Sequence, residues 1–256
     1  MASILECTNS SKSIFDHDIS ASRFSARPLY LQARDAIAQR IAAGDWKPHT
    51  AIPNEADLAR EFGVSPGTMR KALDLAEAER LVTRRQGRGT FVTDPTSDDQ
   101  VERYNCIRGR DGKRAGKEIE VLSLLETTVN ERECLRLHLR LRERVIRIRR
   151  LRLADGRPYM LEDVVLPARL YPNLTHETAS ERTVVMAQKF GVLLGKGEER
   201  VSIGNAAPDV ASALQVDEGH TIMRLDRVIY TLQDKPAEWR MGHCLMDGRY
   251  YLSELR

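Results

Sequence analysis

Apolar residues recur every four positions near the start of the chain. Leu29, Ala33, Ile37 and Ile41 follow this spacing, which is typical of one face of an α-helix. The pattern therefore predicts a helix over residues 28–43 that packs as a scaffold against the segment that follows it.

Two further helices and a β-hairpin are predicted between residues 54 and 92. Asn54 and Ser65 are residue types that cap helix N-termini, and Pro66 suits the first position of a helix. Between the two helices, Gly63 allows the positive φ of a tight turn. A glycine-rich turn between two short strands completes a pattern of helix, turn, helix and hairpin.

Beyond residue 118 the pattern becomes mixed. Apolar residues alternate with arginines over residues 144–153, as in a strand, and Asp155-Gly156 indicates a hairpin turn. Strands are predicted at residues 118–125, 144–153, 158–166, 200–206, 221–232 and 236–246, and helices at residues 130–139, 183–190 and 208–214. Several strands with helices between them predict an antiparallel α+β domain.

Composition and charge limit the classes of function. The 256 residues carry a net charge of only +3, so a basic surface must be local. Neither an apolar run long enough to span a bilayer nor a signal segment is present, which predicts a cytoplasmic protein without a membrane partner. Motifs for phosphate loops, nucleophile elbows and metal ligands are also missing, so we expect no cofactor, no metal and no enzyme activity. The cysteines are predicted to be free thiols, since no close pair occurs among Cys7, Cys106, Cys134 and Cys244.

The N-terminal segment resembles the winged helix-turn-helix domain of the GntR family of bacterial transcription regulators. Five blocks carry the resemblance, namely PLYLQ, IAAGDWKP, IPNEADLA, FGVSPGTMRKAL and RRQGRGTFV, in this order between Pro28 and Val92. Departures occur at five positions, one of which is Asn54, where the family usually has serine. His49 and Arg80 stand where the family usually has glycine, and Ala56 and Pro66 stand where many members have arginine.

This resemblance implies a homodimer that binds an inverted-repeat operator in double-stranded DNA. The start of the second helix would enter the major groove, and the turn of the hairpin would lie near the minor groove. The implied DNA-binding residues are Ser65, Gly67, Thr68, Arg70, Lys71, Gly87, Arg88 and Gly89.

The C-terminal half resembles the UTRA effector-binding domain of the HutC subgroup of this family. The resemblance rests on the following residues: Arg149-Arg150-Leu151-Arg152, Asp155-Gly156-Arg157-Pro158, Glu162, Leu166-Pro167, Ala213-Leu214, Arg227-Val228-Ile229-Tyr230 and Pro236-Ala237-Glu238. The implied fold class is α+β, with a chorismate-lyase-like antiparallel domain after the winged helix-turn-helix domain.

The resemblance also implies where a small effector binds. Arg150 and Arg152 would share one face of a strand and bind an anionic group. Glu162 and Glu238 would accept hydrogen bonds from hydroxyl or amine groups of the effector. Ser180, expected at the start of a helix, would help to hold the anion. From the residues alone, a solvated strand face with surface ion pairs is the alternative.

These features predict four segments, which are a flexible tail at 1–26, a DNA-binding domain at 27–93, a linker at 94–101 and an effector domain at 102–256. The main hypothesis is a ligand-controlled transcription regulator, most often a repressor in this subgroup, that associates with the nucleoid when bound to its operator. Two alternatives stay open. One is a DNA-tethered enzyme that uses Glu162, Glu238 and His243, and the other is a nonspecific nucleoid protein without a ligand.

Overall fold

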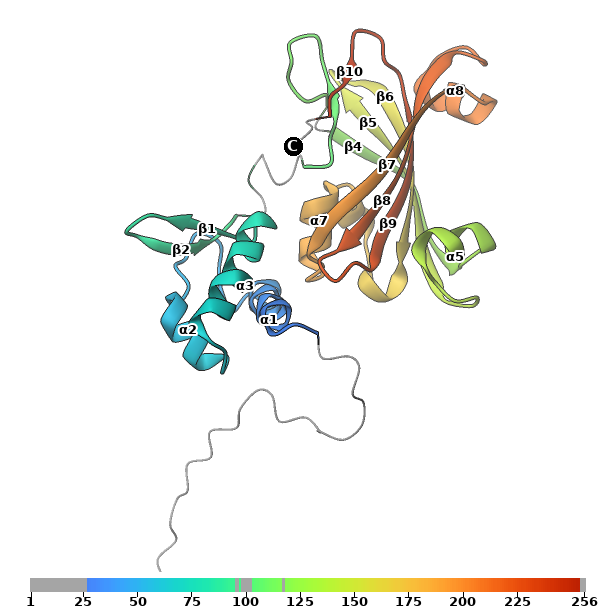
Figure 1. Ribbon diagram of the computed structural model, residues 1–256. Helices are drawn as coiled ribbons and strands as arrows, with labels where there is room; N and C mark the ends of the chain where they lie inside the picture. Colours follow the sequence, from blue (N-terminus) through green and yellow to red (C-terminus); the bar gives the residue numbers. More distant parts are fainter. Residues whose placement is uncertain (1–26, 95–96, 98–102, 117, 254–256) are drawn as a thin grey trace, which may run out of the picture.

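The computed structural model describes residues 27–94, 97, 103–116 and 118–253. It contains a small helical domain with a β-hairpin and a larger domain built on a twisted sheet (Figure 1). The tail predicted at residues 1–26 and most of the linker predicted at 94–101 lie outside the described residues.

The smaller domain has the predicted order of elements, with three helices followed by a hairpin. Asn54 and Ser65 cap the second and third helices, because their side chains accept hydrogen bonds from the backbone N–H groups of Asp57 and Thr68. The elements are α1 (Leu29–Ala43), α2 (Glu55–Glu61), α3 (Pro66–Ala78), β1 (Val82–Arg85) and β2 (Gly89–Val92).

One detail of the predicted stripe on α1 is wrong. Leu29 is 55% exposed, whereas Ala33 and Ile37 are buried in the core of the domain. Arg34, which the pattern places on the polar side, is only 3% exposed. Its Nη1 donates a hydrogen bond to the carbonyl of Leu232 in the larger domain, at 3.0 Å. The buried face of α1 is therefore wider than its apolar stripe, because it also contacts the second domain.

The positions where His49 and Arg80 replace the usual glycine have left-handed backbone. The φ angle is 64° at His49 and 60° at Arg80, and side chains with a Cβ atom are strained in this region. Arg80 follows the end of α3, where glycine most often ends a helix. The departures from the family pattern thus introduce backbone strain and leave the fold unchanged.

Arg80→Gly is expected to raise the free energy of unfolding by roughly 0.5 to 1 kcal/mol, because glycine relieves the positive φ. Urea unfolding followed by circular dichroism would measure this gain. Ala78→Gly is the matched control, since Ala78 lies within α3, and it should lower stability by roughly the same amount. A loss of stability in both variants would contradict the strain at Arg80.

The larger domain is built on one antiparallel sheet of six strands in the order β4-β5-β6-β9-β8-β7. Its hairpins turn where predicted, and Asp155 and Gly156 both have positive φ. The strands are β4 (Glu118–Thr128), β5 (Arg144–Ala154), β6 (Arg157–Pro167), β7 (Leu194–Asn205), β8 (Thr221–Thr231) and β9 (Pro236–Cys244). Two short strands, β3 (Ile107–Arg108) and β10 (Tyr250–Tyr251), pair beside it.

The order of the strands reveals an internal repeat. The segments β4-α5-β5-β6 and β7-α8-β8-β9 have the same sequence of elements, and they meet where β6 pairs with β9. Helix α5 (Glu131–Leu137) packs on β9, while α8 (Pro208–Leu214) packs on β6. The helix of each repeat therefore covers a strand of the other repeat. Asn130 and Glu133 form a capping box at the start of α5. This repeat places α5 and α8 on one face of the sheet (Figure 1).

The opposite face is covered by the connection between β6 and β7. This connection contains a short 3-10 helix, η1 (Ala168–Leu170), followed by α6 (His176–Ala179) and α7 (Thr183–Lys189). Its apolar side chains, among them Tyr171, Leu174 and Met186, pack on Ile148 of β5. The sheet is thus covered on both faces, and each face supports a different constellation of polar residues.

Candidate DNA interface and effector site

The exposed start of α3 is the first candidate interface. Ser65 Oγ accepts a hydrogen bond from the Thr68 N–H at 3.2 Å and lies 2.8 Å from Thr68 Oγ1. These two hydroxyls, with exposed Gly67 and Arg70, form a polar end that projects away from the buried residues of the helix. Free N–H groups at a helix start attract phosphates, and neighbouring side chains can reach base edges.

Arg70 is exposed but already ion-paired. Its guanidinium forms two hydrogen bonds to Glu55 at the start of α2, at 2.8 and 3.2 Å. Lys71 has a different direction, since its Nζ lies over the ring of Tyr30 on α1 at 4.0 Å. Arg70 therefore belongs to the exposed polar end of α3, whereas the side chain of Lys71 lies against α1.

The turn between β1 and β2 presents an exposed arginine. Gly87 and Gly89 have φ angles of 69° and 108°, which explains glycine at both positions. Arg84 is ion-paired with Asp74, and Arg85 lies over the ring of Phe91. Arg88 at the tip has no such partner among the described residues, so it is the guanidinium of the hairpin that is most available for a phosphate.

The predicted effector residues lie together in a buried ionic cluster. Arg150 and Arg152 of β5 both donate to Glu162 of β6, from Nε atoms at 2.7 and 2.8 Å. Arg240 of β9 donates to the same carboxylate at 2.6 Å and to Glu238 at 2.9 Å. All five residues are at most 8% exposed. This arrangement confirms that Arg150 and Arg152 share one face of β5. It rules out the alternative in which they lie on a solvent-exposed strand face with surface ion pairs.

The connection between β6 and β7 closes this cluster. Arg150 Nη1 donates to the carbonyls of Ala179 and Glu181 at 2.9 and 3.3 Å, and Arg240 donates to the Thr183 hydroxyl. Ser180 lies between these carbonyls, but it ends α6 instead of starting a helix. Its hydroxyl donates to the Glu177 carbonyl at 2.6 Å. The expected position of Ser180 at a helix start was therefore wrong, and its role in holding an anion stays a prediction.

Burial and charge oppose each other in this cluster. Burial alone would raise the pKa of the Glu162 carboxyl, but Arg152, Arg240 and Arg150 hold it well below its ordinary value. Burial lowers the pKa of Arg150 and raises that of Tyr171 well above the usual range. Glu162 is thus a carboxylate at neutral pH, and it orients the three arginines around it.

Three buried polar atoms of the cluster have no hydrogen-bond partner among the described residues. They are Nη2 of Arg150, Oε2 of Glu238 and the hydroxyl of Tyr171. The charge of Glu238 influences the pKa values of both Arg150 and Tyr171, which places the three groups in one electrostatic environment. Buried polar atoms without partners are rare in folded proteins and often mark a functional site. Together they offer a donor, an acceptor and a hydroxyl.

Sequence reasoning missed three members of this cluster. Arg240 could have been found, because it lies two residues after Glu238 and therefore on the same face of its strand. Thr183 and Tyr171 gave no such signal, since both lie on the irregular connection that packs across the sheet. A sequence pattern defines the faces of a strand but not which connection covers them.

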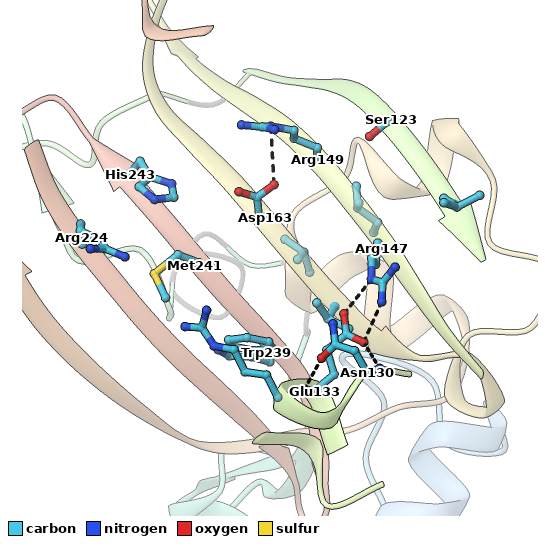
Figure 2. Close-up of a pocket in the computed structure, with 15 residues that line it drawn as sticks. Ser123, Asn130, Glu133, Arg147, Arg149, Asp163, Arg224, Trp239, Met241 and His243 are labelled. Carbon is cyan, nitrogen blue, oxygen red and sulfur yellow. Dashed lines mark hydrogen bonds and ion pairs between the residues drawn. The ribbon is translucent and has the colours of Figure 1, made fainter. Parts of the chain in front are cut away.

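A separate cavity of about 530 Å³ lies on the other face of the sheet. Figure 2 shows its lining, with Arg147 beside Glu133, Arg149 beside Asp163, and His243 and Met241 on a neighbouring strand. None of the predicted effector residues lines it. Because His243 lies in this cavity while Glu162 and Glu238 lie in the cluster, the three do not form a catalytic constellation.

Other classes of site find no support in the described part of the chain. No group of three or more histidine, cysteine or acidic residues there is arranged to hold a metal ion. Cys106, Cys134 and Cys244 are free thiols, as predicted. Among the described helices, none is long and apolar enough to cross a membrane.

Comparisons with known proteins identify both domains. Residues 29–92 match the model of bacterial regulatory proteins of the gntR family, and residues 114–247 match that of the UTRA domain. The chain is 31% identical to the mannosyl-D-glycerate transport/metabolism system repressor MngR of Escherichia coli, over 88% of this chain and 89% of that protein. It is 28% identical to the histidine utilization repressor of Pseudomonas putida, over 84% and 88% respectively.

A solved structure supports the assignment of the larger domain. The ligand-binding domain of a GntR-family transcriptional regulator from Bordetella bronchiseptica superposes with a TM-score of 0.56 at 27% identity. It covers 60% of this chain and 98% of that domain. With the match to the UTRA domain, this similarity confirms the α+β fold expected from the UTRA resemblance.

Proposed function

The chain belongs to the HutC subgroup of the GntR family of bacterial regulatory proteins, and we propose that it is a repressor whose operator binding is controlled by a small anionic metabolite. Several relatives, including those from Pseudomonas putida and Escherichia coli, are named repressors. Regulation of transcription is the activity of the family, and enzyme activity is not. The proposal further specifies a cytoplasmic homodimer and places the two sites on this chain.

The DNA interface comprises the start of α3 and the tip of the hairpin. Ser65, Thr68 and Arg70 face the major groove, and Arg88 lies near the minor groove, where a narrow groove attracts arginine. Two such surfaces related by a two-fold axis match an inverted repeat, so the proposal includes a homodimer. Gly67, Gly87 and Gly89 allow the backbone to approach the phosphates closely, and Lys71 supports the interface beside α1.

The observation that carries the effector site is the buried cluster with three unpartnered polar atoms. Arg150 Nη2 can donate to a carboxylate or phosphate, while Glu238 Oε2 can accept from a hydroxyl or amine. Arg150 is fully buried, so an anion bound there would be shielded from water and held strongly. Arg152 and Glu162 hold Arg150 and Arg240 in place, and Ser180 lies on the segment that would contact the anion.

The segment that closes the cluster also contacts the DNA-binding domain. After α7 the chain continues to Gly191, where a Cβ atom would lie 3.8 Å from the carbonyl oxygen of Ala42 in α1. It then reaches Leu193, whose side chain packs on the core of the smaller domain. An effector needs more space than the small gap of about 20 Å³ beside Arg152, so its entry requires the groups around the cluster to shift. We place this shift in α6 and α7, because they contact Arg150 and Arg240 through Ala179 and Thr183. That shift would reposition α1 and reduce operator affinity to the extent that the effector prefers the shifted arrangement.

Arg70→Ala is expected to weaken operator binding and to reduce the slope of log K against log salt by about one, because one phosphate contact is lost. Glu55→Gln should act in the opposite direction, since it releases Arg70 from its ion pair. Fluorescence anisotropy at several salt concentrations would measure both effects. Arg157→Ala, at an exposed turn of the larger domain, is the matched control. Equal slopes in all three variants would remove Arg70 from the interface.

The proposed function is tested by selecting genomic DNA fragments on the purified full-length protein at physiological salt. Enrichment of one inverted repeat is the expected result, and the genes beside it would narrow the metabolites to be tested for release. Enrichment without a common motif would support a nonspecific nucleoid protein instead. Sedimentation of the protein on a fragment with one repeat would establish whether two copies bind.

A further inference from the structure

The cavity on the outer face of the sheet is separate from the effector cluster. Glu162 and Asp163 are neighbours on β6 and therefore point to opposite faces, the first into the cluster and the second into the cavity. The cavity lies beside α5, over strands of both repeats, with Arg147, Arg149 and Asp163 from one repeat and Arg224, Met241 and His243 from the other (Figure 2). Its volume of about 530 Å³ is in the range of small-molecule sites, roughly 300 to 1,000 Å³.

The charges around this cavity favour an anion. Arg147 is bound by Glu133 at 2.7 Å, and Arg149 lies 3.6 Å from Asp163. Arg132 of α5 and Arg224 of β8 also line the cavity, and no carboxylate among the described residues lies within ion-pair distance of either. Arg149 also pairs with Asp209 at 2.5 Å, so four arginines face three acids. The guanidiniums of Arg132, which lies over the Trp239 ring, and of Arg224 are available to a ligand.

The floor of the cavity is apolar and contains a neutral hydrogen-bonding group. Val165 and Met241 line the floor between the arginines. His243 has a buried Nδ1 atom without a hydrogen-bond partner in the part of the chain that the structure describes. Burial lowers the pKa of His243, although Asp163 opposes this effect, so its imidazole is uncharged at neutral pH. A ligand with an apolar body and one polar substituent would satisfy both features.

Arg224 is positioned for binding by a close contact with the neighbouring strand. Its side chain lies over Gly204 of β7, where a Cβ atom would come within 2.8 Å of the Arg224 Cδ atom. Glycine at this position therefore makes room for the stem of the arginine. Arg224 is nevertheless exposed at its end, so a ligand can reach it without unfolding the site.

We propose that this cavity is a second ligand site, for a small organic anion whose carboxylate or phosphate binds Arg224 and Arg132 and whose apolar body lies on Val165 and Met241. The site is independent of the Arg150 cluster and of the effector that the cluster binds. It lies on strands β6 and β9, which also carry Glu162 and Glu238, so both faces of the same strands would bind ligands.

The test uses benzoate as the probe and the full-length protein with ¹³C-labelled methionine methyl groups. Met241 reports on the cavity, and Met160 reports on the cluster, because it lies beside Arg152 and Glu162. We expect saturable shifts of the Met241 signal, assigned with Met241→Leu, and no shift of Met160. Benzamide, which has the same shape without the charge, should produce no saturable shift.

Arg224→Gln should raise the Kd of benzoate about tenfold, as expected for the loss of one charged hydrogen bond. Arg157→Gln, another exposed arginine of the same domain, should leave the Kd unchanged. Shifts of Met160 instead of Met241, equal affinity for benzamide, an unchanged Kd in Arg224→Gln or no shift at all would each overturn the proposal. Because the readout does not depend on DNA, failure here leaves the repressor proposal intact.

Discussion

Glu162→Gln is expected to lower the free energy of unfolding of the larger domain by about 3 to 5 kcal/mol, the range typical for a buried ion pair that loses one partner. The carboxylate of Glu162 accepts hydrogen bonds from Arg150, Arg152 and Arg240, and all four side chains are buried. A neutral amide cannot balance three guanidiniums in the interior. Urea unfolding followed by Trp239 fluorescence, in a Trp46→Phe background, would measure the loss.

The pH dependence gives this prediction a second readout. The folded-state pKa of Glu162 is held below its unfolded value, so its contribution is present above the unfolded pKa and lost as pH falls through the folded pKa. The difference between the wild type and Glu162→Gln should therefore shrink in acid. Glu126→Gln is the control, since Glu126 pairs with Arg144 on the surface and should cost less than about 1 kcal/mol. Similar losses in both variants would contradict the role of burial.

Local chemistry explains how much of the fold the sequence predicted. Caps at Asn54, Ser65 and Asn130 and the turn at Asp155-Gly156 all lie where expected, because short-range hydrogen bonds and φ preferences determine them. Strand lengths were less certain. The edge strands β4 and β7 extend beyond their predictions, since both are largely exposed and lack the alternation that marks a half-buried strand.

The residues of the candidate sites were also predicted only in part. Strand periodicity correctly placed Arg150 and Arg152 on one face, and the family resemblance added Glu162 and Glu238 from distant strands. The cavity near His243 was not predicted, because its lining comes from α5 and five strands that meet only in the folded sheet. The burial of Arg34 was missed for the same reason, since its partner Leu232 is 198 residues away.

That distant contact joins the two domains through one guanidinium. Arg34 of α1 donates to the Leu232 carbonyl at 3.0 Å and lies 3.3 Å from carboxylate oxygens of both Asp35 and Glu79. Leu232 itself packs within the core of the DNA-binding domain. Burial raises the pKa of Glu79 and Arg34 counteracts this rise, so the arginine stabilises the charged carboxylate. The turn that holds Leu232 continues into β9 and Glu238, which connects this contact to the effector cluster.

Arg34→Met is expected to lower the free energy of unfolding by about 2 to 3 kcal/mol at pH 7, because partly buried acids and a carbonyl lose their partner. The loss should be smaller at acid pH, below the raised pKa of Glu79, because the protonated carboxyl no longer needs the arginine. Urea unfolding at both pH values measures this. Arg27→Gln is the control, because Arg27 also pairs with Asp35 but is exposed. Equal losses at the two pH values would show that the charge of Glu79 does not depend on Arg34. If the variant is stable and its operator binding still responds to effector, the coupling between the effector cluster and the DNA-binding domain passes through α7 instead.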